Sequence, residues 1–329
     1  MTFNTEHGHK QIIRQKWATP ILKFLNKQLG HKLLYLGLPS PEAEDVLAWL
    51  DYLKKVIAFQ CDDDRYPNAF EQLFEKLKQF EQEEKIEDFE AYYGYIEKVI
   101  LQGIDDNENP QSFELDEVVT LYNLDFCNNI TVPIKILDEN GNLRKMYKFD
   151  AVRKLLSIQQ SFPNSSKFVF FLTVHCSYAG LELNNYLEPK NNSNNQGDYI
   201  KNVREQLKGR GTEINARIVR LFVIDTLSHL FKSFGFVPKF LPTILYQGIN
   251  DTPLLTFTVV GVKVQSAGIT PWLQQLGDLI QQKFVTINEE QDLICHSVLD
   301  NEVDIPQVDA VQIISSSPTF QKYWQKINA

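Results

Sequence analysis

The sequence predicts an α/β fold built on a mostly parallel sheet with helices on both faces. Short apolar runs that fit buried strands alternate with amphipathic stretches of helical period, which is the order typical of such a sheet. One long helix, about Ile214 to Phe234, is followed by Thr243–Gly248 and Leu255–Val264 around an Asn250-Asp251 turn. Two strands joined by such a turn predict a final antiparallel hairpin.

Each element follows from a local pattern. Gln11 to Leu29 have apolar residues at helical spacing interrupted by Pro20, which predicts an N-terminal segment of two short helices. Apolar runs rich in β-branched and aromatic residues predict the parallel strands: Lys32–Gly37, Lys55–Gln60, Asp88–Tyr93, Glu117–Phe126 and Lys167–Val174. Helical spacing predicts the helices between them: Glu42–Leu53, Tyr66–Glu83, Glu97–Gly103 and Asp150–Gln160. Ser40 fits the N-cap of the first helix, and Asn140-Gly141 marks a turn before the last.

This order divides the chain into three parts. Residues 1–31 form an N-terminal helical segment, residues 32–265 the α/β domain, and residues 266–329 a C-terminal extension. In the extension we expect a helix over about Thr270 to Phe284. We also expect the extension to cap the domain or to contact a partner protein.

Composition limits the classes of function. Of the 329 residues 43% are hydrophobic, which is enough for a full core. The 33 basic and 42 acidic side chains give a net charge of −9, which argues against broad, non-specific binding to a phosphate backbone. We expect no membrane segment and no secretory signal, because no apolar run is long enough for either. The 4 cysteines form no Cys-x-x-Cys pair and fit the reduced thiols of a cytoplasmic protein.

The chain from Lys32 to Val264 resembles the class I SAM-dependent methyltransferases, a Rossmann-like family, in the order of its elements. Stretches similar to the family's motifs are LLYLG (33–37), VIAFQCDDDRYPNAFEQL (56–73), YYGYIEKVI (92–100) and VVTLYNLDF (118–126). The resemblance implies S-adenosylmethionine as the cofactor. The residues that it assigns to cofactor binding are Gly37, Ser40, Gln60, Asp62 and Gly94.

The motifs depart from the family's pattern where they would contact the cofactor. The family's first loop has an acidic residue and then glycines at alternate positions; this chain has Tyr35, Gly37, Pro39 and Pro41 there. Proline removes a backbone donor and fixes φ, so the loop cannot follow the usual path. With only 15 glycines in the chain, the shortage falls on the loop that needs them most. The family's acids are also replaced at Gln60 and Tyr95.

Asn123 and Asp125 are the candidate catalytic residues. Asp125 ends a predicted central strand, at the edge where open α/β sheets bind ligands. The pair resembles, without the two prolines, a motif with which amino-methyltransferases position the acceptor; the alternative is that Asp125 only braces the next loop. For Cys127, His175 and Cys176 near the same edge we expect structural roles, and we expect no metal site.

Basic residues gather in two segments that fit a nucleic-acid backbone. The candidate contacts in and before the long helix are Arg204, Lys208, Arg210 and Arg217. The N-terminal segment has Lys10, Arg14, Lys16 and Lys23 beside Trp17. A solvated helix face is the alternative explanation for both sets.

Two main functions follow, and the sequence leaves both open; a third alternative is a pocket for another nucleotide-like ligand. The first is a SAM-dependent methyltransferase that acts on or near nucleic acid. The second is a catalytically inactive methyltransferase-fold scaffold, or pseudoenzyme, that serves as the binding subunit of a multiprotein complex. A bacterial defence complex is an example suggested only by the family's associations. The lost glycines and acids favour the second function, whereas the retained Asp125 favours the first.

Overall fold

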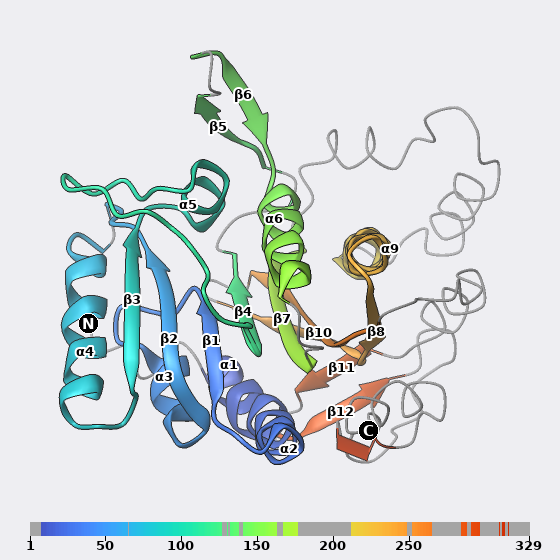
Figure 1. Ribbon diagram of the computed structural model, residues 1–329. Helices are drawn as coiled ribbons and strands as arrows, with labels where there is room; N and C mark the ends of the chain where they lie inside the picture. Colours follow the sequence, from blue (N-terminus) through green and yellow to red (C-terminus); the bar gives the residue numbers. More distant parts are fainter. Residues whose placement is uncertain are drawn as a thin grey trace.

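The computed structural model describes residues 8–64, 66–126, 130, 132–137, 141–162, 167–176, 212–248, 252–264, 284–287, 291–296, 309, 311, 312 and 315. In this part of the chain one large sheet forms the centre of the molecule, and helices cover both of its faces (Figure 1). Its strand order is β12-β11-β9-β10-β7-β4-β1-β2-β3, and β8 also pairs with β10. The α/β architecture expected from the sequence is thereby confirmed.

The predicted parallel strands all form. They are β1 (Leu33–Gly37), β2 (Leu53–Gln60), β3 (Asp88–Tyr93), β4 (Leu121–Asp125) and β7 (Lys167–His175). Each pair of neighbours along β3-β2-β1-β4-β7 is parallel. The carboxyl ends of β1, β2 and β4, from which the candidate site residues come, therefore lie at one edge of the sheet.

The closing hairpin also forms, with more strands than expected. β9 (Thr243–Gln247) and β10 (Pro253–Lys263) pair antiparallel, and β10 is antiparallel to β7. The sequence analysis did not predict β8 (Phe236–Phe240), β11 (Phe284–Ile287) or β12 (Leu293–His296). β11 is parallel to β9, so part of the C-terminal extension continues the same sheet. The helix expected before β11, like the Asn250-Asp251 turn, lies outside the described residues.

Helices on one face come from the first third of the chain: α1 (Gly8–Ile12), α2 (Thr19–Leu29), α3 (Glu44–Trp49) and α4 (Ala69–Gln82). A single turn of 3-10 helix, η3 (Leu50–Tyr52), follows α3. The other face is covered by α5 (Ile96–Gln102), α6 (Lys148–Ser161) and α9 (Thr212–Ser233). No helix in the described part of the chain is long and apolar enough to cross a membrane.

Side chains along each strand point alternately to the two faces of the sheet, and a hydrophobic core lies on each face. In β7, Val169 and Phe171 belong to the core beneath α1 to α4, whereas Phe168, Phe170 and Leu172 belong to the core beneath α5, α6 and α9. All of these side chains are buried. The aromatic run of β7 is therefore core, as the sequence indicates.

The N-terminal segment is one helical stretch rather than two separated helices. A π-helical turn, η2 (Ile13–Ala18), joins α1 to α2 immediately before Pro20. Pro20 has no N–H, and the wider turn lets the carbonyl of Arg14 accept from the backbone N–H of Thr19 and, at 2.8 Å, from its hydroxyl. Trp17 is fully buried, and its Nε1 donates to Thr258 Oγ1 at 2.9 Å. The segment is therefore packed firmly on the sheet.

The predicted cap of the helix after β1 is wrong by one turn. The helix begins at Glu44, after Ala43 in the left-handed region with φ of 52°. Ser40 does not act as the N-cap, although its Oγ accepts from the N–H of Glu44 at 3.2 Å. The N–H of Ala43 donates to the carbonyl of Ser40 at 2.8 Å, so residues 40–43 form a turn and the helix begins only after it.

One substitution tests the packing of the sheet. Gly261 lies opposite Phe168, and an added Cβ would be 2.7 Å from Cε1 of that ring. The ring packs against Phe231 and Phe236 and has no room to move. We expect Gly261→Ala to lower the free energy of unfolding by about 1–3 kcal/mol in urea titrations. Gly8→Ala is the control, because nothing lies within 4 Å of its Cβ position; equal stability of the two variants would contradict the prediction.

Candidate functional site

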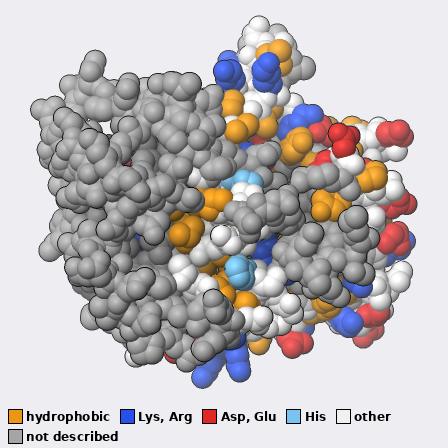
Figure 2. All heavy atoms as spheres, turned by 180° about the vertical axis from the view of Figure 1, so that it is seen from behind, with side chains coloured by type: hydrophobic (Ala, Val, Ile, Leu, Met, Phe, Trp, Pro, Cys, Tyr) orange, Lys and Arg blue, Asp and Glu red, His pale blue; other side chains and the backbone are white. Residues whose placement is uncertain are grey.

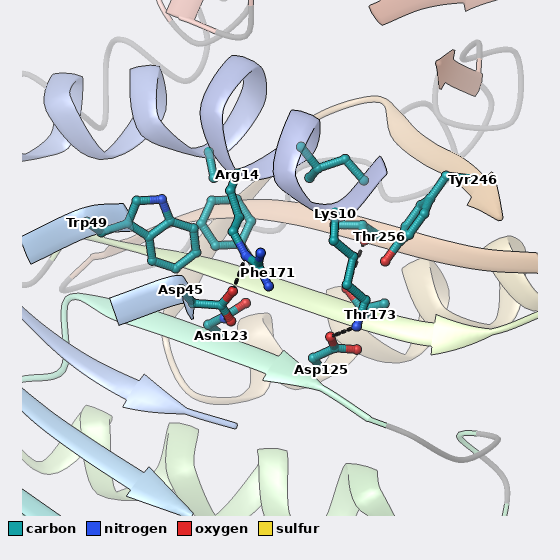
Figure 3. A pocket seen from close by; sticks show the side chains of 12 residues that line it. Lys10, Arg14, Asp45, Trp49, Asn123, Asp125, Phe171, Thr173, Tyr246 and Thr256 are labelled. Atoms are coloured by element: carbon teal, nitrogen blue, oxygen red, sulfur yellow. Dashed lines mark hydrogen bonds and ion pairs between the residues drawn. The ribbon is translucent and has the colours of Figure 1, made fainter. Parts of the chain in front are cut away.

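A pocket lies between the N-terminal helical segment and the sheet, near the carboxyl ends of β4 and β7 (Figure 3). Its empty volume is about 420 Å³ when the part open to solvent is included, and the enclosed part is small. Asn123 and Asp125 line it from β4, and Asp45 lines it from α3. Lys10 and Arg14 enter it from the N-terminal helix.

Lys10 forms an ion pair with Asp125 in the wall of the pocket. The side chains are 27% and 25% exposed, so the pair is only partly screened by water. Burial alone would lower the pKa of Lys10. The charges of Asp125 and Asp45, with the hydrogen bond to Asp125, outweigh burial and raise the pKa of Lys10 above its usual value. Lys10 is therefore a fixed cation beside the candidate catalytic carboxylate.

Arg14 forms a second set of ion pairs one helical turn further on. Its Nε donates to Asp45, and its guanidinium also contacts Glu44 at 2.9 Å. The other oxygen of Asp45 accepts from Asn123 Nδ2 at 2.7 Å, and the same amide lies 3.4 Å from the hydroxyl of Tyr35. A continuous polar network thus joins the N-terminal helix to α3, β4 and β1.

The remaining wall of the pocket is made of hydroxyl and aromatic side chains. Thr173 and Thr256 share a hydrogen bond of 2.8 Å, and Tyr246 lies beside them. Burial raises the pKa of Tyr246 to about 12, so its phenol stays neutral. Trp49 stacks on Phe171 with 6.1 Å between ring centroids, and its buried Nε1 has no hydrogen-bond partner within the described residues.

Sequence reasoning identified part of this pocket. It placed Asn123 and Asp125 at the ligand edge, where the structure brings them together. It missed Asp45, and it assigned Lys10 and Arg14 to a nucleic-acid surface, whereas both bind carboxylates of the same chain. Trp17 is likewise buried and cannot stack on a base. The available signal was the pair of cations one turn apart on a segment whose apolar residues recur at helical spacing.

The residues assigned to a cofactor do not gather in this pocket, and each has a partner within the chain. Gln60 Nε2 donates to the carbonyl of Pro39 at 3.3 Å, and its Oε1 accepts from the N–H of Cys61 at 3.0 Å. Ser40 binds the start of α3, as described above. Asp62 accepts from the N–H of Phe70 at 3.0 Å and so caps α4.

The two glycines of this set are also packed against their own chain. A Cβ on Gly37 would lie 2.7 Å from the hydroxyl of Tyr35. Gly94 has φ of 129°, and a Cβ there would lie 2.9 Å from Oδ2 of Asp106. The close approach that glycine allows at these positions is taken by side chains of the protein itself.

The remaining candidate residues are either buried or outside the described part of the chain. Cys176 is buried, and burial raises the pKa of its thiol to about 12, which supports the structural role expected for it. Cys127, Arg204, Lys208 and Arg210 lie outside the described residues, as does the side chain of Arg217. Among the residues that are described, no group of three or more His, Cys, Asp or Glu side chains could hold a metal ion.

The partly buried His175 predicts how the stability of the protein depends on pH. Burial lowers the pKa of His175 below its usual 6.5, although the charge of Asp125 acts in the opposite direction. The unfolded chain then binds the proton more tightly, so this residue makes stability fall as the pH drops below about 6.5. We expect His175→Gln to reduce that dependence. NMR titration of the wild type should give a pKa below 6.5, and Asp125→Asn should lower it further; titration at or above 6.5 would refute the assignment.

The Arg14 network predicts that removing this largely buried cation costs more stability than removing an exposed one. Arg14→Met leaves the carboxylates of Glu44 and Asp45 without their cation, and we expect a loss of about 2–4 kcal/mol in urea unfolding. The double variant Arg14→Met/Asp45→Asn should recover part of the loss. Lys16→Met is the control, because Lys16 and Asp292 form an exposed pair whose loss costs less than about 1 kcal/mol. Equal losses from Arg14→Met and Lys16→Met would contradict the network.

No protein-family model matches the sequence, and no curated protein matches it. Among solved structures, the YcgJ protein from Bacillus subtilis is 11% identical, with 74% of this chain and 98% of that chain covered and a TM-score of 0.35. An O-methyltransferase from Bacillus cereus in complex with SAH is 9% identical, with 79% and 93% covered and a TM-score of 0.35. TYW2 from Pyrococcus horikoshii in complex with MeSAdo is 14% identical, with 80% and 65% covered and a TM-score of 0.35.

Likeness at these scores is too low to carry a conclusion about the site. The fold is read from the sheet itself, where parallel strands in the order β3-β2-β1-β4-β7 are followed by β10, antiparallel between β7 and β9. This is the arrangement expected from the resemblance described above, with helices on both faces. The chain therefore has a Rossmann-like, methyltransferase-like fold.

Proposed function

We propose that this protein acts by binding, as a methyltransferase-fold subunit that does not transfer methyl groups. The observation that carries the proposal is the ion pair between Asp125 and Lys10 of the chain's own N-terminal helix. A carboxylate that positions an acceptor must face that acceptor with its charge available. In this protein the charge of Asp125 is neutralised, and the space beside it is filled by Lys10.

The residues assigned to S-adenosylmethionine support the same proposal, because they do not fit the role that the resemblance gives them. The hydrogen-bonding groups of Ser40, Gln60 and Asp62 bind backbone atoms of the protein. The space next to Gly37 and Gly94 holds Tyr35 and Asp106. A cofactor would have to displace these contacts, and each displaced polar group would lose a hydrogen bond.

A partner protein is the second part of the proposal. The C-terminal extension, residues 266–329, is the surface that we propose for it. β11 pairs with β9, and Lys16 of the N-terminal segment binds Asp292 at 2.7 Å, so the described part of the extension is held on the domain. These described residues would hold a partner that binds them at a constant position on the domain.

A SAM-dependent methyltransferase is the second candidate. It is favoured by one observation: Asn123 and Asp125 line a pocket that opens to solvent at the carboxyl end of β4. Methyl transfer depends mainly on proximity and orientation, so few acid–base groups are needed. In this alternative the N-terminal helix is a cover that must move before a cofactor or acceptor can enter.

Isothermal titration with S-adenosylmethionine and its demethylated product separates the two candidates. We expect no heat of binding at millimolar ligand for the wild type or for Lys10→Ala/Arg14→Ala, because the contacts of Gly37 and Gln60 remain in both. The control Lys16→Ala/Lys23→Ala removes the same charge from exposed positions of the same segment. Wild-type binding that disappears in Asp125→Ala would refute the proposal. Binding only in Lys10→Ala/Arg14→Ala would favour the methyltransferase with a mobile cover.

A further inference from the structure

The edge strand β3 has backbone groups that no other part of the described chain binds. β3 is the last strand of the large sheet and pairs only with β2. At its carboxyl end the N–H of Tyr93 donates to the Asp105 side chain and its carbonyl accepts from Asp106, so these groups point away from β2. Alternate residues of a strand direct their backbone groups to the same side, so those of Phe89 and Ala91 also point outward. Neither residue has a hydrogen bond on that side within the described residues, which leaves the edge open to a further strand.

Four aromatic rings form a continuous stripe beside this edge, on the face that α4 covers. Tyr93 lies 5.3 Å from Phe70 of α4, measured between ring centroids. Phe70 lies 6.3 Å from Phe74, which in turn lies 5.4 Å from Phe89 of β3. Phe74 is 36% exposed, and the other three rings are half-buried. A strand added at the edge would therefore find an aromatic surface for the side chains that it directs to this face.

The opposite face of β3 carries carboxylates in excess. Lys55 Nζ lies 2.9 Å from Asp88, 2.7 Å from Glu90 and 3.8 Å from Asp116. At neutral pH one lysine neutralises only one of these three charges. The side chains of Asp88 and Asp116 are 52% and 75% exposed, so a second cation can reach them.

The wider surroundings of β3 are acidic as well. Residues 62–90 contain 11 acidic and 4 basic side chains, a net charge of −7 against −9 for the whole chain. In the rear view of Figure 2, acidic side chains gather along the right-hand edge of the molecule, which is the edge that α4 and β3 form on the left of Figure 1. This charge attracts a basic partner and repels nucleic acid, anionic lipid and a second copy of the same acidic edge.

We propose that the edge of β3 binds an extended segment of a partner protein in which lysine or arginine residues alternate with apolar residues. The segment adds to the sheet as a strand, with backbone hydrogen bonds to Phe89 and Ala91. Successive side chains of a strand point to opposite faces, so the apolar ones contact the aromatic stripe and the basic ones meet Asp88 and Asp116.

This surface is separate from the two regions used in the proposed function. β3 and β12 lie at opposite ends of the strand order, so the edge of β3 is remote from the described part of the C-terminal extension. None of the residues of the pocket belongs to β3 or α4. The titration with S-adenosylmethionine therefore has no bearing on this proposal, and the two fail independently.

Fluorescence anisotropy with a labelled octapeptide of alternating lysine and valine, in about 50 mM salt, tests the proposal. We expect the wild type to bind, and Phe74→Ala to bind at least about fivefold more weakly because the valine side chains lose an aromatic contact. Asp88→Asn/Asp116→Asn should weaken binding by a similar factor and reduce its dependence on salt. A peptide with glutamate in place of lysine should not bind.

Hydrogen exchange measured by NMR tests the added strand itself. The amide protons of Phe89 and Ala91 should exchange more slowly when the peptide is bound, because they then donate to it. Those of Glu90 and Tyr92 face β2 and should be protected with and without the peptide.

Leu47→Ala and Asp51→Asn/Asp64→Asn are the matched controls. Leu47 is 52% exposed on α3, and the two aspartates are exposed before and after β2. Both variants should bind the peptide as the wild type does, and circular dichroism should show that all variants are folded. Absence of binding, equal losses in the variants and their controls, or unchanged exchange at Phe89 would each overturn the proposal. Self-association of the protein that Phe74→Ala abolishes would also overturn it, because the surface would then bind a second copy.

Discussion

The pairing of two cations on one helix with carboxylates at the end of the sheet holds this molecule together at its candidate site. Asp45 is buried and the side chain of Asp125 is only 25% exposed, and a carboxylate withdrawn from water in this way needs a partner. Lys10 and Arg14 supply these partners from one face of the same helix. The position of the N-terminal segment is therefore set by electrostatics as well as by its apolar side chains.

This constraint explains why a tyrosine stands where the resemblance places an acid. Tyr35 is fully buried within reach of Asp45 and Asn123. Burial, followed by the charge of Asp45, raises the pKa of its phenol, which keeps the side chain neutral. A carboxylate at this position would add a further buried negative charge to the network. The neutral phenol also fills the space over Gly37, so the loss of the acid and the closure of the loop have one structural cause.

Most of the fold could be predicted from the sequence, because the strands of a covered parallel sheet are long apolar runs and their helices have a clear 3.6-residue period. The short strands β8, β11 and β12 lack such runs, and they form through pairing with β10 and β9, which no local pattern records. The site was predicted in part for the same reason. The end of β4 located Asn123 and Asp125, but Lys10 meets Asp125 across 115 positions of the chain. A helical lysine that faces water and one that faces a buried carboxylate look alike in a sequence.

The charges of the molecule have two separate effects. Lys10 with Asp125 and Arg14 with Asp45 are pairs of opposite charge, so they add little to the field around the protein, and the net charge of −9 comes from the other groups. At physiological salt that field is screened over about 8 Å. Exposed charges of either sign therefore act on a neighbouring molecule only at close range. Net charge alone therefore says little about the partners of this protein; the distance of each charge from the others decides which of them a partner meets first.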